Sequence, residues 1–417
     1  MQNVYDELFG KELIHIVSGV QSDFEVPGSI YKDTAIAVNL FYEDTLQQYF
    51  TYLNNVPPNI EVYIYSSNEK AWDAISCYAA GHSNMFFSKK VNRGRDISAF
   101  LVSFKQVALR KKFVCFLHDK REKSVHFKED TDYWIENLWS NTICSDQYIK
   151  NVLGMLDGTG IGILAPPIPF GEKLSYWYAN QWSDEDFELA CTLADKLGLT
   201  CKIDKRKMPI TLGSVFWCKT EAVRKLLDYD WKYEDFQDEP MSSDGTISHA
   251  IERIFAYVAQ DAGYTTEWIM CSKYAGSLVL KSQSQLTEIF RILKKNFIAE
   301  NMEDLRRYHR QKGVIENFCS KCRKIYLYGA GVEGRKFANW MYIWELSIDG
   351  FIVTKLGAGQ KTVLDIPVYE FDKIEIDKMD GIIITVGSKL CREIEEIVRK
   401  RGDFRYYTPT EEGQSSI

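Results

Sequence analysis

The sequence lacks the features that mark secreted and membrane-spanning proteins. No apolar stretch reaches the roughly 20 residues that a membrane-spanning helix requires, and the polar start Met1–Glu7 does not have the pattern of a secretory signal. The ten cysteines are scattered and mostly embedded in apolar segments, as expected for reduced thiols. We therefore expect a cytoplasmic protein that contacts the membrane, if at all, only at its inner face.

Paired metal ligands are also scarce. Cys319 and Cys322 form a CxxC pair without the second ligand pair that structural zinc needs. The most conspicuous polar strand end, at 118–121, offers a single carboxylate among three basic side chains, whereas Mg²⁺ and Mn²⁺ require several oxygen ligands. We therefore expect no divalent metal and no resident cofactor.

Charge and length narrow the class of protein further. A net charge of -7 argues against a general nucleic-acid binder, so we expect no nucleic-acid partner. At 417 residues the chain is too long for one ordinary core, which predicts at least two domains. The 45% hydrophobic content is that of ordinary globular proteins.

The pattern of short apolar segments predicts an α/β fold. A strand over 34–40, a helix over 46–53 and a strand over 61–65 indicate a βαβ unit and a parallel sheet. Further strands are predicted over 85–87, 113–117, 160–165 and 211–218, and in the last hundred residues over 324–328, 349–354 and 381–386. We expect a first domain over 1–280, a helical connector over 281–322 and a smaller α/β domain over 323–417.

Two polar clusters follow predicted strands. His118, Asp119, Lys120 and Arg121 come directly after the apolar run 113–117, and Arg93, Arg95 and Asp96 open a predicted helix over 97–109. Ligands of open α/β sheets bind outside the carboxyl ends of the strands. If the two strands are neighbours, the clusters converge on one anionic ligand, and the basic side chains can contact phosphate oxygens directly.

A third polar region supplies carboxylates. Glu239 and Asp244 precede a helix predicted from Thr246 onward, which carries His249 and Arg253. Transfer of a sugar from a nucleotide donor needs stabilisation of the leaving diphosphate and a general base for the acceptor hydroxyl. Asp244 is a candidate base with Glu239 as the alternative, although Asp244 also occupies a predicted N-cap position, which needs no catalytic role.

These segments together resemble the rhamnan synthesis protein F family of bacterial polysaccharide glycosyltransferases. The resemblance lies in 92–100, His118-Asp119-Lys120, 213–217, and Asp244-Gly245-Thr246 with His249, Glu252 and Arg253. It implies a GT-A-like fold and inverting transfer of rhamnose from a dTDP-activated donor to a growing glycan or lipid-linked glycan. In this interpretation we assign Asp244 or Glu239 as the catalytic residue. The expected substrate-binding residues are Arg93, Arg95, Asp96, His118, Asp119, Lys120, Arg121, His249 and Arg253.

The last hundred residues carry a different motif. Gly329, Gly331 and Gly334 follow a predicted strand and open a predicted helix, which fits the dinucleotide fingerprint and resembles small Rossmann-like domains. An NAD site also expects an acid after the next strand, where this chain has Lys355. A structural or nucleotide-sensing module is therefore favoured. A nicotinamide-dependent sugar-modifying enzyme and a non-catalytic assembly scaffold remain the alternatives to a glycosyltransferase.

Overall fold

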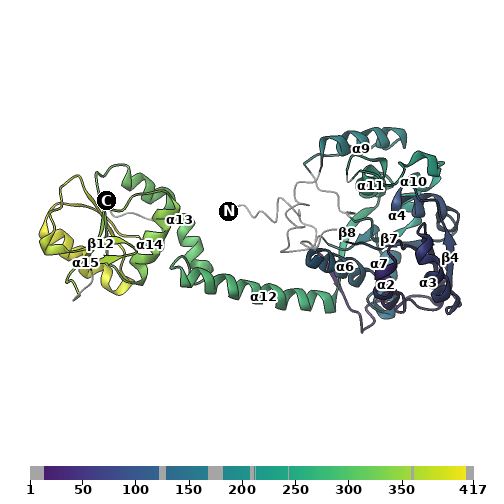
Figure 1. The fold of residues 1–417 in the computed structure, drawn as a ribbon, viewed down its shortest axis with the longest axis horizontal. Coiled ribbons are helices and arrows are strands. Elements are labelled where there is room, and N and C mark those ends of the chain that lie inside the picture. Colours follow the sequence, from purple (N-terminus) through teal and green to yellow (C-terminus); the bar gives the residue numbers. More distant parts are fainter. Residues whose placement is uncertain are drawn as a thin grey trace. The chain divides into compact units, whose positions relative to one another are not determined.

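Short apolar segments form the strands of two separate β-sheets (Figure 1). The computed structural model describes residues 14–121, 128–167, 182–206, 211, 213–242, 244–357 and 361–409. The chain divides into two units, residues 1–280 and residues 281–417. Each unit combines one sheet with helices, so the predicted α/β fold with two domains is confirmed. Within the described ranges, no helix is both long and apolar enough to cross a membrane.

The first unit is built on a mixed sheet of eight described strands in the order β1-β8-β6-β7-β5-β2-β3-β4. β7 runs antiparallel to both of its neighbours, and the other neighbouring pairs are parallel. The bounds are β1 His15–Val17, β2 Thr34–Asn39, β3 Glu61–Ser66, β4 Met85–Lys89, β5 Phe113–His118, β6 Ile161–Ala165, β7 Phe216–Lys219 and β8 Thr265–Cys271. The predicted strand 211–218 is thus too long at its start, where Leu212 lies outside the described residues.

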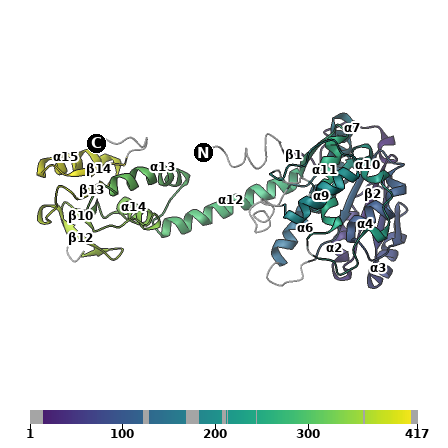
Figure 2. The ribbon, with the colours of Figure 1, turned by 90° about the horizontal axis from the view of Figure 1, so that it is seen from above.

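Helices cover both faces of this sheet. Figure 2 shows α9 and α11 side by side, in agreement with Figure 1 and with their contacts. The bounds are α2 Leu46–Leu53, α3 Glu69–Ala80, α4 Arg95–Ser98, α5 Lys105–Ala108, α6 Lys128–Ile143, α7 Asp146–Gly158, α9 Asp184–Lys196, α10 Arg224–Asp228, α11 Ile247–Asp261 and α12 Ser272–Lys295. The single helix predicted over 97–109 is wrong, because a π-helical turn over Ala99–Ser103 separates α4 from α5.

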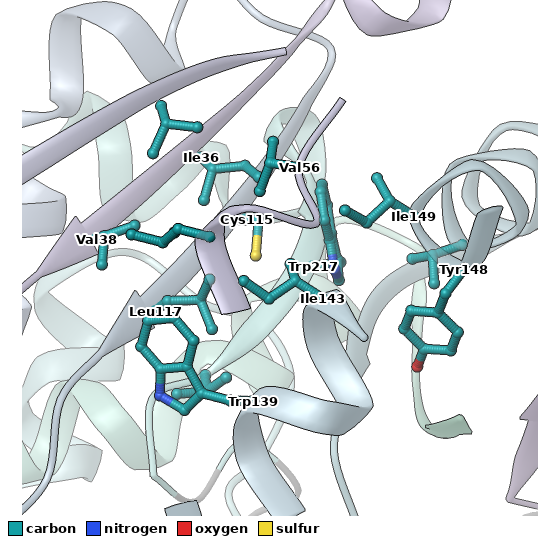
Figure 3. Packing of buried hydrophobic residues seen from close by; sticks show 14 of the residues in the cluster. Ile36, Val38, Val56, Cys115, Leu117, Trp139, Ile143, Tyr148, Ile149 and Trp217 are labelled. Carbon is teal, nitrogen blue, oxygen red and sulfur yellow. The ribbon is translucent and has the colours of Figure 1, made fainter. Parts of the chain in front are cut away.

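The central strands are buried on both faces, which explains their continuous apolar sequence. In β2, Ile36 and Val38 join one hydrophobic cluster, whereas Ala35 and Ala37 join the cluster on the opposite face. Figure 3 shows the first cluster, where Trp139 and Ile143 of α6 and Tyr148 and Ile149 of α7 pack over Ile36, Val38, Cys115 and Leu117. The cluster on the other face is covered by side chains of α4, α9 and α11. This packing fixes the register in which Asn39, the last residue of β2, lies opposite His118 of β5.

The second unit contains a smaller sheet in the order β11-β12-β10-β9-β13-β14. Its strands are parallel except for the β11–β12 pair. The bounds are α13 Met302–Cys319, β9 Ile325–Tyr328, α14 Val332–Ile343, β10 Gly350–Val353, β11 Thr362–Val363, β12 Ile366–Glu370, β13 Gly381–Ile384, α15 Ser388–Arg401 and β14 Arg405–Tyr407.

The glycine-rich turn between β9 and α14 depends on two of its three glycines. Gly329 has a φ of 115°, a region that L side chains rarely adopt. A Cβ on Gly334 would lie 1.8 Å from the carbonyl oxygen of Gly329, so any side chain there forces the helix away from the strand. A Cβ on Gly331 would meet nothing within 4 Å. Gly329 is therefore required by its backbone conformation and Gly334 by packing, whereas Gly331 is required by neither.

We predict that Gly334→Ala destabilises the second unit by about 3 kcal/mol, because the methyl group overlaps main-chain atoms that cannot rotate away. Gly331→Ala is the matched control, with an expected cost of about 1 kcal/mol or less at this N-cap. Hydrogen exchange of the full chain, followed in peptides from β9 and α14, measures the loss of stability in each variant. Equal protection in the two variants would show that the turn relaxes without cost.

Candidate functional site

A pocket of about 390 Å³ opens at the carboxyl ends of β2 and β5. It contains most of the residues that the sequence predicts to bind substrate. Its walls are formed by Asn39, Phe41, Tyr42, Asn92, Arg95, Asp96, His118, Asp119, Lys120, Arg121, Thr131, Trp134 and Glu239.

The two basic clusters meet here, although their strands are not neighbours. Since β2 and β3 lie between β4 and β5, the expected adjacency of these strand ends is wrong. The loops after the strands are instead joined one to the next. Asn92 accepts a hydrogen bond from the Ser67 hydroxyl (3.0 Å), and the Asn68 side-chain amide donates to the Phe41 carbonyl (2.6 Å). The main-chain amide of Phe41 in turn donates to the Asp119 carboxylate (2.6 Å). This series of contacts brings the segment after β4 across the sheet end to the segment after β5.

Asp119 acts within the protein rather than toward the pocket. Its carboxylate accepts hydrogen bonds from the main-chain amides of Phe41 (2.6 Å) and Tyr42 (2.7 Å), and the residue is 5% exposed. Burial raises the pKa of Asp119 to about 7, and the two amide hydrogen bonds oppose that rise. The geometry therefore assigns this carboxylate to tying the end of β5 to the segment after β2.

His118 is held between main-chain carbonyl groups. Its Nδ1 lies 2.9 Å from the carbonyl oxygen of Asp119 and its Nε2 lies 2.6 Å from that of Gly213. The nearest carboxylate is Asp96, whose Oδ2 lies 3.7 Å from Nε2. His118 is 7% exposed, so its ring forms a wall of the pocket and fixes the Gly213 segment against it.

Lys120 places a positive charge in the pocket. Its ammonium lies 3.9 Å from the centre of the Trp134 ring. It makes no hydrogen bond or ion pair within the part of the chain that the structure describes. Burial lowers the pKa of Lys120, while Glu252, Asp96 and Asp119 act in the opposite direction. A partly buried cation without a carboxylate partner favours an anionic ligand.

The three arginines of the basic clusters have different positions. Arg121 is paired with Asp44 at 3.0 Å on the rim of the pocket. Arg95 lies in the wall of the pocket, with its Nε 3.4 Å from Glu239 and its Nη2 3.3 Å from the Met241 carbonyl oxygen. Arg93 is outside the wall and forms a 2.8 Å ion pair with Asp238. Arg93 therefore holds the loop that carries Glu239, and its contact with phosphate stays a prediction.

Asp244, His249 and Arg253 form a second cluster outside the pocket wall. Arg253 Nη2 lies 3.4 Å from Asp244 Oδ1 and 3.0 Å from Asp186 Oδ2. Asp244 is not the N-cap of α11, because the Thr246 side chain accepts the hydrogen bond from the His249 amide. The predicted cap is therefore wrong, and Asp244, with 44% of its side chain exposed, is available for another role.

The charges of this second cluster are coupled. Burial and the neighbouring carboxyl group of Asp244 together raise the pKa of Asp186 to about 7, against the opposing charge of Arg253. Partial burial alone would raise the pKa of Asp244, but the hydrogen bond from Asp186 and the charge of Arg253 lower it. Burial also lowers the pKa of His249. The charge of Asp244 raises this pKa, and the charge of Arg95, which lies in the pocket wall, lowers it.

Asp186, Asp244 and His249 also place potential metal-ligand atoms within 4.8 Å of one another. Two carboxylates and one imidazole are a suitable donor set for a divalent cation. The Arg253 guanidinium already lies against both carboxylates and supplies positive charge at that point. The arrangement therefore favours the fixed positive charge of Arg253 over an exchangeable metal ion.

The sequence predictions miss Asp186 and Trp134. Asp186 is in phase with Ala190, Leu193 and Ala194 of α9, all of which are buried, so an acid on the core face of that helix is the signal that would have revealed it. Trp134 lies on α6, 14 residues after Lys120, and no local pattern links the two.

Comparison with known proteins identifies one family. A sequence model of the family described as rhamnan synthesis protein F matches residues 16–264, which is more than half of the chain and includes both clusters. Two relatives, each named uncharacterized protein WxcX, come from two strains of Xanthomonas campestris pv. campestris. Each is 27% identical over 174 residues, which is 42% of this chain and 24% of the relative, so the chain matches about a quarter of their length.

We predict that Asp119→Ala destabilises the first unit by about 2–4 kcal/mol, because two partly buried main-chain amides lose their acceptor. Asp119→Asn should cost less, since its side-chain oxygen still accepts a hydrogen bond. Chemical denaturation measures the difference. Wild-type stability in Asp119→Ala, combined with loss of nucleotide binding, would instead assign Asp119 to the ligand.

Proposed function

The chain belongs to the rhamnan synthesis protein F family, and we propose that it is a glycosyltransferase that uses a nucleotide-activated sugar to extend a bacterial polysaccharide. The observation that carries the proposal is the pocket at the ends of β2 and β5, where Lys120 and Arg95 stand with the carboxylates of Asp96 and Glu239. Its volume of about 390 Å³ is within the range of small-molecule sites.

Lys120 is the proposed main contact of the donor diphosphate. Its ammonium is held over Trp134 and, within the described residues, lacks a carboxylate partner, so a phosphate oxygen would supply the missing counter-charge. Arg95 and Arg121 would add charge at the wall and the rim if the ligand displaces their contacts with Glu239 and Asp44. These fixed cationic side chains would stabilise the leaving diphosphate in place of a divalent metal, so the proposed reaction needs no metal ion.

The proposed base is Asp244, with Glu239 as its competitor. A polymeric acceptor arrives from solvent, and 44% of the Asp244 side chain is exposed against 19% for Glu239. Arg253 and Asp186 keep the Asp244 carboxylate ionised. In the proposed step the acceptor oxygen attacks the anomeric carbon on the face opposite the diphosphate. The bond from that carbon to the diphosphate breaks, and Asp244 takes the hydroxyl proton.

The finer assignments rest on the family resemblance. We propose a GT-A-like first unit, dTDP-rhamnose as donor and a glycan or lipid-linked glycan at the inner membrane face as acceptor. We propose a supporting, Rossmann-like role for the second unit. Its glycine turn has the positive φ at Gly329 and the close approach at Gly334 that fit a dinucleotide fingerprint. Lys355, however, follows β10 at the place where a nicotinamide site would have an acid.

Lys120→Met is predicted to weaken binding of dTDP about 10- to 100-fold, because one buried charged contact to phosphate is lost. Isothermal titration calorimetry measures the affinity. Lys89→Met is the matched control, since its ammonium also lies 3.9 Å from a ring centre, that of Trp72, but outside the pocket wall.

The same titration in EDTA tests the metal-free donor site. Unchanged affinity supports it, whereas binding that depends on added Mn²⁺ contradicts it. Equal affinity of wild type and Lys120→Met for dTDP would remove the diphosphate from this pocket.

Asp244→Asn is predicted to lower the release of dTDP from dTDP-rhamnose, with water as the acceptor, by about 10²–10⁴-fold. The fold should be kept, because Thr246 and not Asp244 caps α11 and because Asn still presents an oxygen to Arg253. Glu239→Gln is the comparison variant. Loss of turnover in Glu239→Gln alone would move the base into the pocket wall, and normal turnover in both variants would exclude the two carboxylates.

A further inference from the structure

Asp186 is the least exposed acid near the proposed base. It lies in the first turn of α9, where Asp184 and Glu185 are also acidic, but Asp186 alone of the three is fully buried, with 0% of its surface exposed. Its Oδ1 accepts a hydrogen bond from the Gly245 amide at 3.1 Å, and its Oδ2 lies 3.0 Å from Arg253 Nη2. One buried carboxyl group thus holds the main chain directly after Asp244 and the guanidinium that contacts Asp244.

The groups around Asp186 carry more negative than positive charge. Asp244 faces it from the loop before α11, and Arg253 faces it from α11, which also carries His249 and Glu252. Glu185 comes from α9 itself, and its Oε2 lies 2.7 Å from the position of a Cβ on Gly245. Arg253 is the cation that contacts Asp186 and Asp244. Two carboxylates against one guanidinium leave a surplus negative charge that a proton can neutralise.

Asp186 and Asp244 place carboxyl oxygens within 4.8 Å of each other, and both contact the same nitrogen of Arg253, at 3.0 and 3.4 Å. Two carboxylates this close repel each other unless one of them carries a proton that it can donate to the other, since a carboxylate can only accept. We propose that Asp186 is a positioning residue that carries this proton and donates it as a hydrogen bond to Asp244, so that the base is ionised and fixed in place. The proposal rests on the proposed function, because it assigns Asp244 as the base.

The environments of the two groups agree with this placement of the proton. Burial raises the pKa of Asp186, whereas Asp244 is held below its ordinary value by the hydrogen bond and by Arg253. The macroscopic titration belongs to the pair. The competing explanation is a divalent cation held by Asp186, Asp244 and His249.

Two substitutions of Asp186 separate these explanations. Asn imitates a protonated Asp, because its amide group donates to Asp244 while its oxygen accepts from Gly245. We therefore expect Asp186→Asn to keep most of the wild-type release of dTDP from dTDP-rhamnose, and Asp186→Ala to lose about 100-fold through displacement of Asp244. The wild-type rate should decline above about pH 7 as the pair loses its shared proton, and the Asp186→Asn rate should not.

Thermal unfolding supplies a readout that does not need activity. The pKa of Asp186 is raised in the folded state, so its stabilising contribution is full below the ordinary value of 3.8 and is lost as the pH rises toward about 7. The melting temperature of wild type relative to Asp186→Asn should therefore fall as the pH rises through this window and stay level above it.

The outcomes are distinct. An Asp186→Asn variant as inactive as Asp186→Ala overturns the proposal, as does a melting-temperature difference that does not vary with pH. Stoichiometric Mn²⁺ binding by wild type that is absent in Asp186→Asn would establish the cation instead. If the pH-dependent difference appears but wild type releases no dTDP, the proton-sharing pair stands and the proposed function fails.

Discussion

The contact between the Asp119 carboxylate and the amides of Phe41 and Tyr42 is the constraint on which the pocket depends. It fixes the segment after β5 against the segment after β2, and it does so at the point where both strands leave the hydrophobic layers. Lys120 follows directly and is held by a reciprocal contact, in which its amide donates to the Tyr49 hydroxyl and that hydroxyl donates to its carbonyl oxygen. The ammonium is therefore positioned by main-chain contacts and Trp134, without an ion pair to any of the described residues.

Much of the fold follows from local sequence. The strands β2, β3 and β5 and the helix α2 are predicted because burial on both faces demands continuous apolar segments, and amphipathic spacing marks the helix. The three-residue β1 is missed because its place in the sheet depends on β8, which is far away along the chain. The same reason explains the incorrect adjacency of β4 and β5, since strand order is decided by contacts between distant segments.

The candidate site, like the fold, is predictable from sequence only in part. Polar residues after strands are found from sequence, and Arg95, Asp96, His118, Lys120 and Glu239 do meet in one pocket. What sequence does not reveal is which partner each side chain takes. Asp119 binds main-chain amides and Arg93 binds Asp238, whereas Lys120 has no charged partner among the described residues. The N-cap of α11 was also ambiguous, because Asp244 and Thr246 are both good capping residues and only the geometry selects Thr246.

The pairing of β1 with β8 has a consequence for synthesis on the ribosome. His15 lies opposite Ile269, so β1 is synthesised long before its partner β8, which is made almost last in this unit. At about 5–20 residues per second, the wait is roughly 12–50 seconds. During that time the growing chain can assemble β2 to β5, whose partners are close in sequence, but it cannot complete the edge of the sheet. The brevity of β1 limits what a waiting strand exposes to other nascent chains.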